Sequence, residues 1–124
     1  MRIWDLPPEI LCRQHLLGEH RELHGLWNVI TLGKTGYREH PETKRWIGRL
    51  AALYGRHEAL VAEMHRRGYR HKTPLDLRLA TGSQVQELLV GALDEQYRLL
   101  CEKPCGCPLT PGTEYGKPWT GRVA

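Results

Sequence analysis

One long amphipathic segment constrains the fold of this chain more than any other feature. Between Cys12 and Leu32, apolar side chains recur at intervals of three and four residues, which is the period of an α-helix. At 100° per residue, the apolar positions that share one arc of about 100° are Cys12, Leu16, Leu23, Leu26, Trp27 and Ile30. Such a stripe must be buried against other elements, so the sequence predicts a helical core.

The rest of the chain extends the helical pattern. Residues 33–45 are rich in Gly, Pro and charge and are expected to form a loop. A second helix is predicted from about Trp46 to Arg67, since Gly68 is a good residue for ending a helix. Its expected buried stripe consists of Ile47, Leu50, Tyr54, Val61 and Met64.

A third helix is predicted from about Ser83 to Glu102, with Ser83 as N-cap and Gln86 at the capping-box position. Tyr69 to Gly82 is expected to form a loop with one short turn after Pro74. No stretch alternates in the manner of a β-strand. We therefore expect an all-α fold, in which residues 1–124 form a single compact domain of three main helices with an irregular C-terminal tail.

The length and the charge of the chain limit the kinds of protein that it can be. A chain of 124 residues has room for one domain, and no apolar run approaches the roughly 20 residues of a membrane span. With no signal-peptide pattern either, a soluble, cytoplasmic monomer is expected. The net charge is +4, but Lys34 to Arg78 alone contains 11 Lys or Arg against 5 Asp or Glu. A basic middle of this kind is typical of a protein with a polyanionic partner.

The N-terminus and one face of the first helix supply the parts for amine chemistry. Polar residues on that face are Gln14, His15, Gly18, Glu19, Arg21, Glu22 and Gly25. Because Arg2 is large, Met1 is expected to be retained and to carry the free α-amine. An α-amine has a pKa of about 7.7–8.0 and is therefore neutral, and nucleophilic, far more often than a lysine at pH 7. These groups are the ones needed to attack a sugar carbon in DNA through a Schiff base: an amine, a carboxylate and several arginines.

Three segments resemble one family. They are Arg2-Ile3 with Gln14-His15-Leu16, Glu19 and Arg21-Glu22-Leu23; then Arg56 to Met64 running into Arg67-Gly68-Tyr69; and finally Tyr115-Gly116-Lys117. In this order and spacing, they resemble the pyrimidine-dimer DNA glycosylases of the phage endonuclease V type. The resemblance implies a DNA-repair glycosylase with an associated abasic-site lyase, acting on double-stranded DNA that contains a damaged base or an abasic site.

The resemblance also implies roles for individual residues. Met1 would supply the nucleophilic amine and Glu22 the catalytic carboxylate. The residues expected to bind DNA are Arg2, Gln14, His15, Arg21, Tyr115 and Lys117. Neither a cofactor nor a metal ligand is expected.

Two other functions are compatible with the residues. One is a DNA-binding module with the same fold and no catalysis. Another is a small metal-binding protein that uses Cys101, Cys105 and Cys107, or His20 and His24, whose i,i+4 spacing presents two imidazoles on one helix side. For the histidine pair the sequence offers no evident third ligand.

A second basic face is predicted on the helix that follows the basic loop. Arg45, Arg49, Arg56 and Arg67 fall within about 40° of one another on a helical projection. Such a stripe either follows a phosphate backbone or is an ordinary solvated face.

Overall fold

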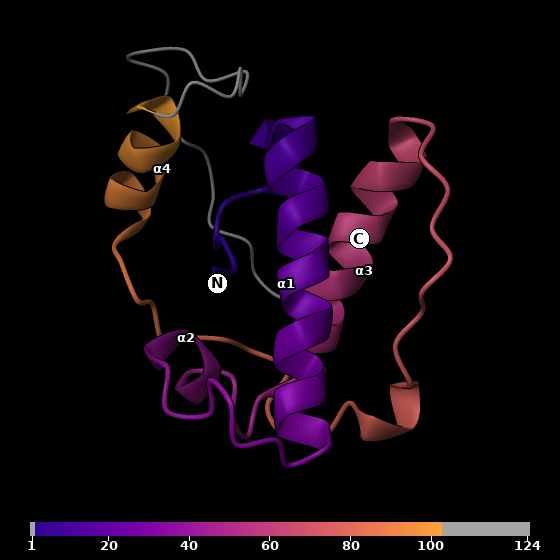
Figure 1. Ribbon diagram of the computed structural model, residues 1–124. Helices are drawn as coiled ribbons and strands as arrows, with labels where there is room; N and C mark the ends of the chain where they lie inside the picture. Colours follow the sequence, from indigo (N-terminus) through magenta and orange to yellow (C-terminus); the bar gives the residue numbers. More distant parts are fainter. Residues whose placement is uncertain (1, 103–124) are drawn as a thin grey trace.

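The structure is a computed structural model that describes residues 2–102, with side chains described through residue 100. The helices are α1 (Arg13–Thr31), α2 (Pro41–Lys44), α3 (Leu50–Arg66) and α4 (Leu93–Glu102), with the 3₁₀ turns η1 (Pro8–Ile10) and η2 (Leu77–Leu79). Residues 2–102 contain no β-strand, only an isolated bridge between Arg49 and Gly82. The all-α prediction is confirmed (Figure 1). Within this described part, no helix combines the length and apolar character needed to traverse a bilayer.

The core lies between α1 and α3, which run side by side in Figure 1. The prediction for the first helix is confirmed, since α1 begins and ends within one residue of the predicted limits. Its stripe is buried as expected, with Leu16, Leu23 and Leu26 fully inaccessible and Ile30 packed at the edge of the core. The 3.6-residue period was sufficient to predict the limits of this helix, because one face of the helix is covered along its whole length.

The second helix begins later than predicted. Residues 41–44 form the separate short helix α2, which Pro41 starts and His40 caps by accepting a hydrogen bond from the Glu42 N–H. A turn follows in which Gly48 has a φ of +79°, a conformation that no α-helix contains. As a result α3 begins at Leu50, and Ile47 is 44% exposed rather than buried.

The third helix is half as long as predicted, because tertiary hydrogen bonds hold the segment that was expected to start it. The Ser83 N–H donates to Gly48 O, and Ser83 O accepts from the Ala52 N–H. Ser83 therefore helps to cap α3 from outside that helix. The Gln86 side chain donates to Arg45 O instead of forming a capping box. Helix α4 starts only at Leu93.

The N-terminal segment is the feature of the fold that positions the candidate site. In Figure 1 it lies between α1 and α4. Its side chains from Ile3 to Leu6 are all buried. A segment so close to the chain end is ordered only when other parts of the protein hold it, and here buried charged side chains do so.

Candidate active site

A pocket of about 320 Å³ opens where the N-terminal segment meets the polar face of α1. Its walls are formed by Arg2, Trp4, Gln14, His15, Gly18, Glu19, Glu22 and Leu99. Four residues predicted from the sequence, Arg2, Gln14, His15 and Glu22, are thus brought together around one cavity. The predicted residues Met1, Tyr115 and Lys117 lie outside the described residues, as do the side chains of the three C-terminal cysteines.

Carboxylate and amide side chains fix the backbone of the N-terminal segment. The N–H groups of Ile3, Trp4 and Asp5 donate to Glu42 Oε1 at 3.3 Å, Glu19 Oε1 at 3.1 Å and Gln96 Oε1 at 2.9 Å. Three consecutive backbone donors are thus bound by side chains from α2, α1 and α4. This arrangement holds the chain in one register beside the pocket.

Two buried arginines bind the carbonyls of the same segment. Arg45 donates to Ile3 O, and Arg56 donates to Leu6 O, each at 2.8 Å. Arg45 is also paired with Asp5 at 2.9 Å and Glu42 at 2.7 Å. These side chains are at most 8% exposed, so the network is shielded from solvent.

Glu19 is paired with Arg56 and therefore has a structural role. Two of the Arg56 nitrogens donate to its carboxylate at 2.6 and 3.0 Å, and both side chains are completely buried. Burial raises the pKa of Glu19, while the Arg56 guanidinium and the Trp4 N–H oppose that rise. With its oxygens used by Arg56 and Trp4, Glu19 is poorly suited to serve a substrate.

Removing the charge of Arg56 is expected to destabilise the protein strongly. In Arg56→Met the Glu19 carboxylate would stay buried without its partner, which costs about 3–5 kcal/mol. Urea unfolding monitored by circular dichroism measures the loss. The double variant Arg56→Met/Glu19→Gln, which keeps an acceptor for the Trp4 N–H, should recover much of it. A loss below about 1 kcal/mol in the single variant would contradict this account of the pair.

Glu22 differs from Glu19 because its side chain reaches solvent at the edge of the pocket. It also borders a second pocket, of about 440 Å³, whose other walls are Gly25, Asn28, Val29, Lys34, Gly36 and Tyr37. Gly18 and Gly25 flank Glu22 along α1, and a Cβ atom at either would meet nothing within 4 Å. The polar face around Glu22 is therefore open.

Arg2 and His15 lie on the aromatic wall of the first pocket. The Arg2 guanidinium is stacked 4.7 Å from the centre of the Trp4 ring, and its buried Nε has no hydrogen-bond partner among residues 2–100. His15 approaches the edge of Trp4, and its Nδ1 lies 3.3 Å from the Cys12 Sγ. Arg2 thus retains hydrogen-bonding capacity at the pocket.

Arg21 is exposed but lines neither pocket, since its position is turned by about 100° from Glu22 around α1. Its contact with DNA stays a prediction.

The sequence predicted that Arg45, Arg49, Arg56 and Arg67 share an exposed face, either phosphate-binding or simply solvated, and neither alternative holds for Arg45 and Arg56. Arg45 and Arg56 are 4% and 0% exposed and are used in the network around the N-terminal segment. Arg67 donates to Leu11 O at 2.6 Å. The helical projection failed for a physical reason. It shows which residues share a face, but it does not show that Asp5 and Glu19, on other elements, or Glu42, three residues before Arg45, pair with these arginines.

Histidines form the one group that could hold a metal within the described part of the chain. The pair that the sequence offered only as an alternative, His20 and His24, is joined by His57 and His71. Burial, followed by repulsion from the neighbouring rings, lowers the pKa of His20 to about 4. Burial also lowers the pKa of His24 and His57. Sequence spacing could not reveal His57 and His71, because both come from outside α1.

A family model matches more than half of the chain. The model described as pyrimidine dimer DNA glycosylase matches residues 1–77, a range that includes every wall residue of the first pocket except Leu99. No curated protein and no solved structure gave a significant match. The chain belongs to the pyrimidine dimer DNA glycosylase family, and it is accordingly a DNA-repair glycosylase with DNA as its substrate.

Proposed function

We propose that this protein excises a damaged pyrimidine through a Schiff base formed by its N-terminal α-amine and then cleaves the strand as an abasic-site lyase. The observation that carries the proposal is the anchoring of residues 3–5 beside the pocket that contains Glu22. Arg2 lines this pocket, and the Cα atoms of adjacent residues are only about 3.8 Å apart. Because Met1 is bonded to Arg2, a wall residue of this pocket, we propose that its amine acts together with the Glu22 carboxylate.

In the first step the neutral amine attacks the sugar C1′ of the damaged nucleotide. The C1′–N bond to the base breaks, and the base leaves with a proton. The sugar ring opens and an imine forms between C1′ and the amine nitrogen. The exposed carboxylate of Glu22 would stabilise the positive charge that develops on the sugar.

In the second step the imine acidifies the proton on C2′. Removal of that proton, for which Glu22 is the nearest proposed base, expels the 3′ phosphate by β-elimination. Water then hydrolyses the imine and restores the amine. The two pockets on either side of Glu22 offer space for a nucleotide displaced from the duplex, as enzymes that act on bases require.

Borohydride trapping on DNA with one abasic site tests the proposal. A covalent protein–DNA adduct is expected, and peptide mass mapping should find it on residue 1. Affinity for the DNA without any adduct would instead favour a non-catalytic binding module. An adduct on a lysine would refute the assignment of the nucleophile.

Arg21 provides a test of how the DNA is held. If Arg21 grips a phosphate next to the reacting sugar, Arg21→Ala should lower the magnitude of the salt slope of binding by about one unit. Arg78, whose side chain is 89% exposed on η2, is the matched control. Its replacement should matter less, because a charge distant from phosphate is screened over about 8–10 Å. A larger effect from Arg78→Ala would mean that the DNA crosses a different face.

A further inference from the structure

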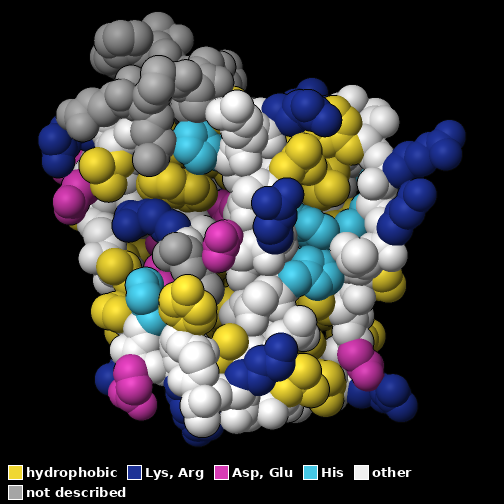
Figure 2. Space-filling model, viewed as in Figure 1, with side chains coloured by type: hydrophobic (Ala, Val, Ile, Leu, Met, Phe, Trp, Pro, Cys, Tyr) yellow, Lys and Arg dark blue, Asp and Glu magenta, His cyan; other side chains and the backbone are white. Residues whose placement is uncertain are grey.

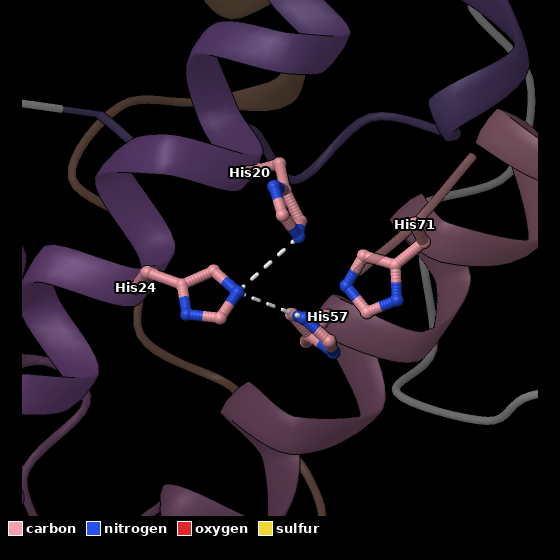
Figure 3. A group of neighbouring side chains, drawn as sticks. All are labelled: His20, His24, His57 and His71. Atoms are coloured by element: carbon pink, nitrogen blue, oxygen red, sulfur yellow. Dashed lines mark hydrogen bonds between the residues drawn. The ribbon is translucent and has the colours of Figure 1, made fainter. Parts of the chain in front are cut away.

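Four imidazoles converge on the side of α1 that faces away from the pocket. His20 and His24 lie one turn apart on α1, His57 comes from α3, and His71 comes from the segment that follows α3. Figure 3 shows their rings turned toward a common centre. One nitrogen from each ring lies within 4.8 Å of the others. The charged groups of the candidate active site are not part of this cluster.

Hydrogen bonds between the rings do not explain the convergence. His24 Nε2 lies 3.2 Å from both His20 Nε2 and His57 Nε2. A ring nitrogen has one position in its plane, which holds either a hydrogen or a lone pair. His24 Nε2 can therefore satisfy one of these neighbours as a donor or acceptor but not both. Three nitrogen atoms this close are, however, well suited to share a cation.

We propose that His20, His24, His57 and His71 form a site for one divalent transition-metal ion, with Zn²⁺ as the preferred ion. Zn–N bonds of about 2.0–2.1 Å in a tetrahedron place the nitrogen atoms about 3.3–3.4 Å apart. The two 3.2 Å separations are close to this value. His71 lies on a non-helical segment, so a small movement of its ring completes the tetrahedron.

A neighbouring carboxylate already orients one of the ligands. Glu58 Oε1 lies 3.0 Å from His57 Nδ1. A proton held on Nδ1 by that carboxylate leaves the lone pair on Nε2, the atom that faces the other histidines. Carboxylates that bind the distal nitrogen of a ligating histidine are a regular feature of metal sites.

The ligand type determines which ions the site would take. Imidazole suits Zn²⁺, Cu²⁺, Ni²⁺ and iron, whereas Mg²⁺ and Ca²⁺ prefer oxygen ligands. His57 is fully buried, but the other three rings are only partly covered. Histidine side chains are visible at the surface over α1 and the neighbouring elements in Figure 2, so an ion has a path from solvent.

Such an ion would join three parts of the fold. Its ligands connect α1, α3 and the segment after α3, which otherwise continues into the exposed residues 72–74. Since the opposite face of α1 carries Glu22, the site would fix the helix on which the proposed chemistry depends. We assign the ion a structural role, because four protein ligands leave no position for a substrate.

Titration with Zn²⁺ and Co²⁺ tests the site in the full chain with Cys101, Cys105 and Cys107 replaced by Ser. Calorimetry should give one Zn²⁺ per chain, and Co²⁺ should produce the visible bands of a tetrahedral nitrogen site without thiolate charge-transfer absorption. The melting temperature should rise with Zn²⁺ concentration, because the ion binds the folded state. Mg²⁺ should have no effect.

Variants test whether metal binding depends on these four histidines. His20→Gln and His71→Ala should each abolish the Co²⁺ bands and the thermal shift, and Glu58→Gln should weaken Zn²⁺ binding by about 10–100-fold. His65, on α3 with its ring 6.5 Å from that of His71, is the matched control, and His65→Gln should bind normally. Circular dichroism without metal shows that each variant is folded. Absence of Zn²⁺ binding in the parent chain, or equal binding in folded His20→Gln and His71→Ala, would overturn the proposal.

Discussion

Blocking the α-amine of Met1 is expected to abolish both base excision and strand cleavage while leaving the fold intact. An acetylated amine has no free lone pair and cannot form an imine, and no lysine with the usual pKa of about 10.4 is neutral often enough to replace it at pH 7. The same loss is expected when a short Gly-Ser extension precedes Met1. Gel assays on DNA with a single pyrimidine dimer or abasic site measure the two activities.

The extension provides its own control. If a protease site is placed so that cleavage leaves Met1 first, activity should return after cleavage in the same sample. Circular dichroism should be identical before and after, since side chains of the core bind the backbone of Ile3 to Leu6. An extended chain that works at the normal rate would show that the amine is not the nucleophile.

Replacement of Glu22 by Gln is expected to reduce excision by about 10²–10⁴-fold with little change in DNA affinity. The amide keeps the shape of the side chain but removes the negative charge that would stabilise a cationic sugar. Because Glu22 is exposed and makes no ion pair among residues 2–100, the fold should tolerate the change. Single-turnover kinetics at saturating protein separates the chemical step from binding.

Glu39→Gln is the matched control, since Glu39 is 83% exposed and lines neither pocket. Its replacement should leave the excision rate unchanged. Near-normal excision by Glu22→Gln would remove Glu22 from the mechanism. Glu19 is not an equivalent alternative, because its replacement disturbs the pair with Arg56 and hence stability.

Helices with one continuously buried face could be predicted from the sequence alone. The limits of α1 and its stripe of buried leucines follow from local periodicity, which a covered helix face preserves. Part of the wall of the first pocket could also be predicted, because Gln14, His15 and Glu22 lie on one side of that helix, whereas Trp4 and Leu99 were not predicted. Helix starts that depend on distant partners were missed. Gly48 and Ser83 meet through tertiary hydrogen bonds, and these delay α3 and shorten α4.

The sequence by itself thus determined the helical class, the polar face of α1 and the family of this protein. Only the tertiary structure decided which charged side chains are buried and paired. Arg45 and Arg56 resemble DNA-binding arginines on a helical projection, yet Asp5 and Glu19, buried carboxylates on other elements, pair with them. In the same way, the tertiary structure brings His57 and His71 next to His20 and His24. The physical reason is common to both: periodicity records the direction of a side chain on its own helix, whereas burial and charge pairing depend on groups that other segments bring to it.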